Sequence, residues 1–310
     1  MITSEKAHGL TDEEIAFYEQ NGYVLAKGVF TREEAALFRE ETHALVHRLM
    51  SVSDPSVRGE GWTITREEAA LFQEEAHALA HRLMSVSDPN VRGKGWTSGA
   101  KVTDLRRELM HCHNVQFHSA ALARLIIDPR LTDRAADIIG PNVQLHHTKM
   151  FIKPPERGAP FPMHQDYSYF PHENHTMIAA TIHFDDAPIE KGCIRVVPGS
   201  FKNGPYDHIH EGGSHLPTEQ YLVEKATPCP AETGDVLFFS YLTIHGSGLN
   251  ITDQPRTTLL VQMRDPSDRP MGLQHLSRGQ GMMLRGIDPE ADADSHVASE
   301  SRYLSQLRKE

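Results

Sequence analysis

The chain has 310 residues, of which 39% are hydrophobic and 24% are charged, and its formal net charge is −11. A chain of this length and polarity can build one large hydrophobic core, so we expect a single domain over residues 1–310. The acidic balance, with no cluster of lysine and arginine, argues against nucleic acid as a partner. No apolar run approaches about 18 residues, so we expect no membrane span.

The cysteines indicate the compartment. Cys112, Cys193 and Cys229 are odd in number and far apart in the sequence, which is not the pattern of a disulfide framework and favours a reducing compartment. Residues 1–6 lead into no apolar stretch, so no secretory signal is expected. We therefore predict a cytoplasmic protein, whose oligomeric state the sequence leaves open.

The N-terminal part, residues 1–141, has mainly helical patterns. Thr11 with Glu14 three residues later forms a capping box, which marks the start of a helix, and Gly22 marks its end. Two further segments of this part also have a helical pattern. We predict helices over residues 11–22, 117–128 and 130–140, and a strand over residues 22–30.

A tandem duplication is the most unusual feature of this part. Residues 31–63 recur at residues 65–97, with differences only at positions 39, 42, 46, 56 and 60 of the first copy. Each copy opens with a capping box, Thr31 with Glu34 in the first, and continues with apolar residues at helical spacing. Two copies are too few for a helical solenoid. We therefore predict one extra amphipathic helix with no chemical role.

The sequence pattern changes from helical to strand-like in residues 142–265, the part that we expect to be catalytic. Apolar runs there are separated by Pro, Gly and Asp. Helices followed by strands indicate an α+β protein whose later half is a β-sandwich or barrel. Residues 266–310 form a C-terminal tail that is expected to be peripheral. We predict strands over residues 143–155, 177–187, 193–200, 234–247 and 256–265.

The first candidate metal ligands are His164 and Asp166. In an extended segment, residues i and i+2 point to the same face, so both side chains can reach one metal ion. A second imidazole from a distant strand would complete the triad of two histidines and one carboxylate that is typical of non-haem Fe(II) oxygenases. In a chain with 20 histidines this short pattern also arises by chance, so it needs a second observation.

The second observation is His245, which follows an apolar run over residues 236–244, with Arg256 beyond the next turn. A dicarboxylate cosubstrate such as 2-oxoglutarate chelates iron through its keto acid, and its far carboxylate then needs a cation. Arginine supplies a permanently charged, bidentate fork for that carboxylate. Ser247 would add a hydroxyl group. Together these residues predict a site for iron and a dicarboxylate.

A third pair of residues, His146 and His147, is a weaker candidate for metal binding. Adjacent residues of a strand face opposite ways, so at most one of the two points inward. We therefore do not expect the pair to bind a metal ion.

Three segments resemble the phytanoyl-CoA dioxygenase family of Fe(II)/2-oxoglutarate oxygenases. They read HTKMFIKPPERGAPFPMHQDYSYFP, CIRVVPGSFKNG and GDVLFF…HGSGLN…PR. The resemblance implies a double-stranded β-helix, in which two four-stranded sheets form a barrel with iron at one mouth. It also implies that His164, Asp166 and His245 are the iron ligands and that Arg256 anchors 2-oxoglutarate.

The resemblance extends to the cosubstrate but not to the substrate. Lys149 falls on the strand where relatives contact 2-oxoglutarate. Ile182 falls at the position where the phytanoyl-CoA enzyme of the family has a Trp beside the 2-oxoglutarate. Phe201 stands where related sequences carry His, which loosens any assignment to phytanoyl-CoA. The candidate substrate contacts are Gln144, on the strand beside the metal, and Tyr169, just past the His164 motif.

We therefore predict an oxygenase that uses Fe(II), 2-oxoglutarate and O2 to hydroxylate an unactivated C–H bond. The partner would be a small metabolite or an acyl-CoA, with succinate and CO2 as coproducts. One alternative is a cupin-like metal enzyme that does not use 2-oxoglutarate, against which Arg256 argues. The other is a catalytically inactive metal-binding interaction protein, against which the intact candidate ligands argue.

Overall fold

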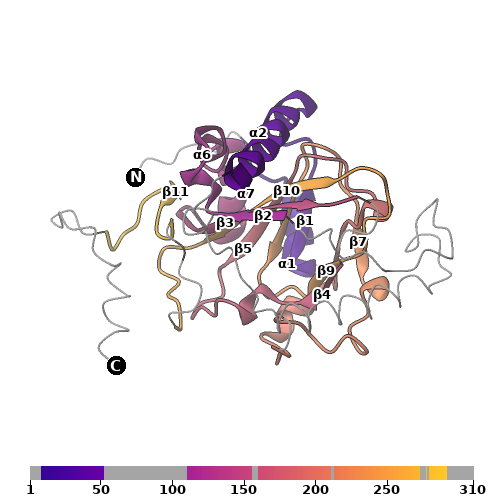
Figure 1. Cartoon of the computed structure of the whole chain (residues 1–310). Coiled ribbons are helices and arrows are strands. Elements are labelled where there is room, and N and C mark those ends of the chain that lie inside the picture. The colour runs from indigo at the N-terminus through magenta and orange to yellow at the C-terminus, as the bar shows by residue number, and fades with distance from the viewer. Residues whose placement is uncertain are drawn as a thin grey trace.

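The computed structural model describes residues 8–51, 110–155, 160–210, 213–272, 277 and 279–291. Two antiparallel β-sheets pack face to face, and helices cover the outer face of the larger sheet (Figure 1). The second copy of the duplicated segment, residues 65–97, lies outside the described residues. The extra amphipathic helix therefore stays a prediction.

The larger sheet has seven strands in the order β1-β8-β5-β10-β3-β11, and β2 also pairs with β3. β10 lies near its centre, between β3 and β5. The strands are β1 (Tyr23–Ala26), β2 (Met110–His113), β3 (Val143–Lys153), β5 (Ile178–His183), β8 (Val236–Ser240), β10 (Arg256–Arg264) and β11 (Met283–Arg285).

The smaller sheet has four strands in the order β4-β9-β6-β7. Its strands are β4 (Phe161–His164), β6 (Ile194–Val196), β7 (Thr227–Cys229) and β9 (His245–Ser247). Val196 and Cys229 from this sheet cluster with Ala179, Leu237 and Phe239 from the larger one, so the two sheets share a core. This arrangement confirms the predicted double-stranded β-helix, although its larger sheet has more strands than expected.

Residues alternate between the two faces of the larger sheet. Leu259, Val261 and Met263 of β10 belong to the apolar cluster beneath the helices. Because successive side chains of a strand point to opposite faces, Arg256 and Gln262 of the same strand face the smaller sheet. The outer face of the larger sheet, beneath the helices, is therefore apolar, whereas its inner face carries buried polar groups.

The helices α2 (Arg32–Ser51), α6 (Ala120–Leu125) and α7 (Pro129–Ile139) cover the outer face (Figure 1). α7 begins one residue before the predicted start, with Pro129 in the first turn and the Asp128 carboxylate accepting from the Arg130 backbone amide. The capping box of α1 (Asp12–Asn21) is also present, and Gly22 ends that helix in the left-handed conformation.

The prediction of one strand over residues 234–247 is wrong in one respect. β8 ends at Ser240, and β9 begins at His245 in the other sheet. A turn joins them, in which the Thr243 amide donates to the Ser240 carbonyl at 2.8 Å. The turn is as buried as the strands, with Tyr241 and Ile244 at most 1% exposed. Its apolar composition therefore concealed the crossing between sheets.

The β-structure is not confined to residues 142–265. β1 comes from the mainly helical N-terminal part and pairs with β8 along its whole length. β2 and β11, which precede and follow the expected core, both pair with β3. The N-terminal part and the beginning of the tail are thus integral parts of the larger sheet.

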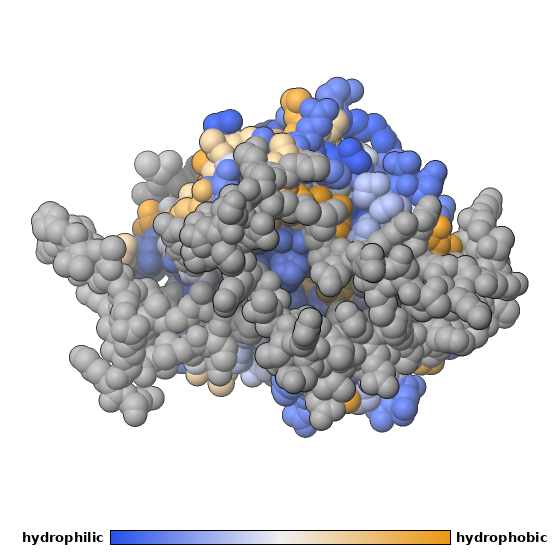
Figure 2. Space-filling view, viewed as in Figure 1, coloured by the Kyte–Doolittle hydropathy of each residue, from blue (hydrophilic) through white to orange (hydrophobic). Residues whose placement is uncertain are grey.

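The surface of the described residues mixes apolar and polar side chains (Figure 2). Exposed large apolar residues include Leu37 on α2 and Ile127 after α6, and isolated residues of this kind are normal on a protein surface. Within the described ranges, no helix has both the length and the apolar character to cross a bilayer. All three cysteines are buried and free; the cytoplasmic location stays a prediction.

The contact between the turn before β8 and the segment before α2 generates a stability prediction. Gly234 has φ of +95°, and a Cβ there would overlap the Phe30 carbonyl oxygen, whereas Gly28 has φ of +57° with nothing within 4 Å of its Cβ position. Gly28→Ala should cost only the left-handed strain, about 1–2 kcal/mol. Gly234→Ala should cost at least about 2 kcal/mol more, because backbone must move. Equal losses in a denaturant titration would contradict this packing.

Candidate metal centre

Three side chains meet at one end of the smaller sheet. His164 ends β4, His245 begins β9, and the two residues are directly opposite each other in the antiparallel pairing. Their ring centroids are 4.3 Å apart. Asp166 begins the short 3-10 helix that follows β4. Strand pairing therefore brings together two histidines that are far apart in the sequence.

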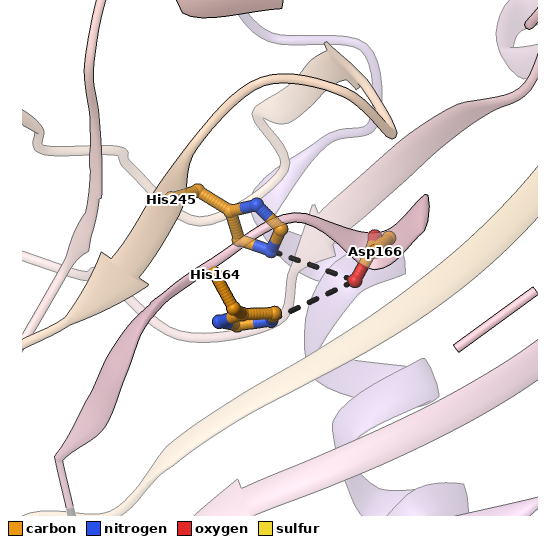
Figure 3. Close-up of side chains that lie close together, drawn as sticks. All are labelled: His164, Asp166 and His245. Atoms are coloured by element: carbon orange, nitrogen blue, oxygen red, sulfur yellow. Dashed lines mark ion pairs between the residues drawn. The ribbon is translucent and has the colours of Figure 1, made fainter. Parts of the chain in front are cut away.

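The geometry of this cluster suits a single metal ion. One carboxylate oxygen, Asp166 Oδ1, lies 3.7 Å from His164 Nε2 and 3.7 Å from His245 Nε2, as Figure 3 shows. Two ligands about 2.1 Å from one ion are at most about 4.2 Å apart. Among the residues that the structure describes, this is the one group of three or more His, Cys, Asp or Glu whose ligand atoms all lie within 4.8 Å.

The backbone orients both imidazoles. His164 Nδ1 lies 2.8 Å from the Pro162 carbonyl oxygen, and His245 Nδ1 lies 2.9 Å from the Thr243 carbonyl oxygen. A carbonyl only accepts, so Nδ1 carries the proton in each ring and Nε2 keeps its lone pair. Both lone pairs face the cluster, which is the arrangement that orients histidine ligands in metal sites.

A side chain of the larger sheet orients the Asp166 carboxylate by a hydrogen bond. Gln262 Nε2 on β10 donates to Asp166 Oδ2 at 2.5 Å, which leaves Oδ1 for the cluster. The intervening Gln165 has an extended backbone, and its side-chain Nε2 donates to the Leu242 carbonyl at 2.6 Å, away from the cluster. The expected extended geometry of the His164 motif is thus present.

The protonation states favour metal binding. Burial lowers the pKa of His245 to about 4, so its imidazole is neutral at pH 7. Burial also favours the neutral acid at Asp166, but the imidazoles of His245 and His164 outweigh this effect and lower its pKa to about 2. The cluster therefore offers one carboxylate and a neutral imidazole without releasing protons from these two groups.

A second polar region lies between the sheets, around Arg256. Its Nη1 donates to the Gly192 carbonyl, and its Nε has no hydrogen-bond partner within the described part of the chain. Burial lowers the pKa of Arg256 to about 10. Beside it, Lys153 Nζ donates to Ser247 Oγ at 2.7 Å and to the Gly248 carbonyl at 2.6 Å. This region is rich in donors and suits an anion.

Three other predicted site residues have definite positions. Lys149 on β3 has a pKa lowered to about 8 by burial, which the charge of Asp166 opposes. The ring of Tyr169 lies 6.1 Å from that of His164, and its hydroxyl donates to the Ser214 carbonyl at 3.1 Å. Gln144 Nε2 donates to Asp288 at 3.3 Å.

The structure corrects the place expected for Ile182. Its side chain is fully buried in the apolar cluster beneath the helices, on the outer face of β5. Its neighbours Thr181 and His183 take the inner face instead, because side chains alternate along a strand. Ile182 is therefore not a cosubstrate contact.

The two adjacent histidines also differ from expectation. A bulge in the pairing of β10 with β3 leaves His146 as an extra residue between His147 and Leu145. Such a bulge interrupts the alternation of side chains. Both rings consequently approach Phe170, with centroids 4.8 and 5.3 Å away. The two side chains therefore lie on the same side of the strand, and the expectation that they face opposite ways is wrong.

Sequence reasoning missed Gln262 and Lys153. Gln262 lies six residues after Arg256 on one strand, so period two alone places both on the same face. Lys153 ends the apolar run before Pro154, where a charge inside a strand signals a partner or a ligand. Both features can be recognised in the sequence, but neither shows which residue of another strand lies opposite Gln262 or Lys153.

Comparison with known proteins places this site in a family. Residues 18–258 match the family model described as phytanoyl-CoA dioxygenase. A probable alpha-ketoglutarate-dependent hypophosphite dioxygenase of Stutzerimonas stutzeri is 30% identical over 161 residues, 49% of this chain and 56% of that protein. The ectoine dioxygenase of Bordetella parapertussis is 24% identical over 281 residues, 82% of this chain and 75% of that protein.

Coverage differs between these relatives, since the match to the first of them spans only about half of its length. Among solved structures, the non-heme alpha-ketoglutarate-dependent carbocyclase SnoK from nogalamycin biosynthesis superposes with a TM-score of 0.60. It is 20% identical, and the match covers 88% of this chain and 93% of that one. This likeness confirms the fold. The family match spans the metal cluster and Arg256, and the chain belongs to the phytanoyl-CoA dioxygenase family.

Proposed function

We propose that the protein is an Fe(II)- and 2-oxoglutarate-dependent oxygenase that hydroxylates a C–H bond of a small metabolite or acyl-CoA. Succinate and CO2 would be the coproducts. The observation that carries this proposal is the cluster of His164, Asp166 and His245, in which each ligand atom is oriented toward the others. Family membership supports the same chemistry.

The chain's own residues would hold the metal in a fixed orientation. His164, Asp166 and His245 would hold Fe(II), and Gln262 would keep the Asp166 carboxylate turned toward it. When bound, Fe(II) supplies open coordination positions for the cosubstrate and for activation of O2. The protein's part is to orient these ligands and exclude water from the reacting atoms.

The buried cation beside the cluster supports a dicarboxylate cosubstrate. Arg256 Nε lacks a partner within the described residues although it is buried, so a carboxylate there would satisfy it. Ser247 lies next to this region and adds a hydroxyl. Lys149, within electrostatic reach of Asp166, would contact the cosubstrate nearer the metal.

The family and the site indicate the cosubstrate more specifically than the substrate. The relatives are named for hypophosphite, for ectoine and for phytanoyl-CoA, so family membership does not select among these classes. Tyr169, beside His164, is the substrate contact that the geometry favours. Gln144 would contribute only if its amide left Asp288.

The first test concerns the metal. Asp166→Ala should abolish tight Fe(II) binding, and Gln262→Leu should weaken it about 10- to 100-fold, because the carboxylate loses its orienting partner. His210, which is exposed, is the control, and His210→Ala should bind Fe(II) like the parent. Anaerobic metal titration with thermal unfolding of each variant measures both effects. An Asp166→Ala protein with parental affinity would refute the metal assignment.

The second test concerns the cosubstrate. Arg256→Lys keeps the charge but loses the planar fork, so the apparent KM for 2-oxoglutarate should rise by more than about tenfold. Succinate formed in turnover at varied 2-oxoglutarate gives this value. An unchanged KM would mean that another group binds the far carboxylate.

A further inference from the structure

Three buried hydrogen-bond acceptors around the metal cluster have no donor in the described part of the chain. They are Gln262 Oε1, His172 Nε2 and His215 Nε2, and these residues are 0%, 0% and 3% exposed. The proposed reaction uses none of the three atoms. A buried acceptor costs free energy in every state in which nothing donates to it, so a ligand with matching donors would relieve that cost.

Each of these atoms is identified as an acceptor by the hydrogen bond of the other polar atom in its side chain. Gln262 Nε2 donates to the Asp166 carboxylate, which only accepts, so the other amide atom is the carbonyl oxygen. His172 Nδ1 lies 2.9 Å from the Phe170 carbonyl, and His215 Nδ1 lies 2.9 Å from the carbonyl of the next residue. Nδ1 therefore carries the proton, and Nε2 keeps the lone pair of the neutral ring. Burial lowers the pKa of His172, so that ring is neutral at pH 7.

Two of the acceptors lie against the larger sheet. Gln262 is opposite His147 in the pairing of β10 with β3, and directly opposed residues share a face. The ring of the bulged His146 lies 5.0 Å from that of His147 and 5.3 Å from that of His172. A row of packed side chains therefore connects His172 to Gln262, whose amide holds Asp166.

The third acceptor lies beside the smaller sheet. The Leu216 amide donates to the Met163 carbonyl at 2.8 Å, and both side chains belong to one apolar cluster. Because side chains alternate along an extended backbone, the adjacent His215 and His164 face the opposite way, toward the metal cluster. Burial lowers the pKa of His208, and the nearby His164 and His215 lower it further, so both rings are its neighbours. Acceptors thus flank the cluster on two sides.

The charges on this side of the site disfavour a cationic ligand. Lys149 and Arg264 share the inner face of the larger sheet with Gln262. Asp166 is turned toward the metal position, and the Asp268 carboxylate accepts three hydrogen bonds from the loop that precedes β5. With a divalent metal bound, these groups sum to a positive charge. The matching donors are therefore neutral O–H or N–H groups rather than ammonium groups.

We propose that the substrate is a polar molecule whose neutral O–H or N–H groups donate to Gln262 Oε1, His172 Nε2 and His215 Nε2. The inference rests on the proposed function and narrows its substrate class. The acyl chain of an acyl-CoA would bring only C–H groups and leave the three acceptors unpaired. A site that hydrogen-bonds its substrate rejects analogues that lack the matching groups.

The melting temperature of the substrate-free protein gives the first test. Asn keeps a donor at the position of histidine Nδ1 but has no atom at the position of Nε2, whereas Gln places an amide there. Because nothing in the described ranges donates to Nε2 of His172 or His215, the Asn and Gln variants at each position should melt within about 1 °C of each other.

The matched control is His208, whose Nδ1 lies 2.8 Å from the Tyr206 carbonyl and whose Nε2 accepts from the Gln165 backbone amide at 2.9 Å. His208→Asn should melt about 2–4 °C below His208→Gln, because a backbone donor loses its acceptor. If His172→Asn or His215→Asn falls equally far below its Gln variant, the protein itself uses that acceptor, and the inference is wrong.

Turnover with chosen probes gives the second test. Succinate formed above the substrate-free rate is measured with glycerol and myo-inositol as O–H donors, acetamide as an N–H donor and butanoyl-CoA as an acyl thioester. An O–H or N–H probe should stimulate succinate formation, and butanoyl-CoA should not. With the stimulating probe, His172→Asn and His215→Asn should raise the apparent KM about tenfold, and the Gln variants less than about threefold.

The outcomes separate this inference from the proposed function. Stimulation by butanoyl-CoA, or Asn and Gln variants with equal KM values, would overturn the inference and leave the oxygenase assignment intact. If none of the probes stimulates, the melting comparison alone decides. If the parent forms no succinate from 2-oxoglutarate with Fe(II), with or without a probe, the proposed function itself fails.

Discussion

The two-residue alternation of β10 is the constraint on which the rest of the site depends. Its odd-numbered residues, Leu259 to Met263, are anchored in the core beneath the helices. That burial turns Arg256 and Gln262 toward the smaller sheet, where Arg256 lies beside Lys153 and Gln262 donates to Asp166. A slip of one residue in the pairing of this strand would place both polar groups in the helical core.

The inner side of the sheet carries a concentration of buried polar groups that a purely structural core would not need. A buried donor or acceptor without a partner costs about 1–3 kcal/mol, and a buried charge costs more. Near the metal cluster, the partners are present, since Pro162, Thr243 and Gln262 satisfy the ligands. Around Arg256 they are incomplete within the described residues, since its Nε has no partner there. The metal-binding groups of the first region are thus held by partners within the protein, whereas the second region keeps a free donor.

Local signals in the sequence predicted those elements whose geometry depends on near neighbours. The capping boxes at Thr11 and Thr31 formed as expected, because a cap involves residues three apart. The extended conformation between His164 and Asp166 was predictable for the same reason. The crossing from β8 to β9 was not, because the buried turn at Tyr241 has the same apolar composition as the strands beside it. The bulge at His146 was equally invisible, since it depends on a second strand.

The sequence by itself determined the class of fold, the identities of His164, Asp166, His245 and Arg256 as candidates, and their family resemblance. These depend on residue types and short spacings, which are properties of the chain alone. Only the tertiary structure decided that Ile182 faces away from the site and that Gln262, Lys153 and His183 face it. The physical reason is that register between distant strands is chosen by burial of the whole sheet face, and no short segment contains that information.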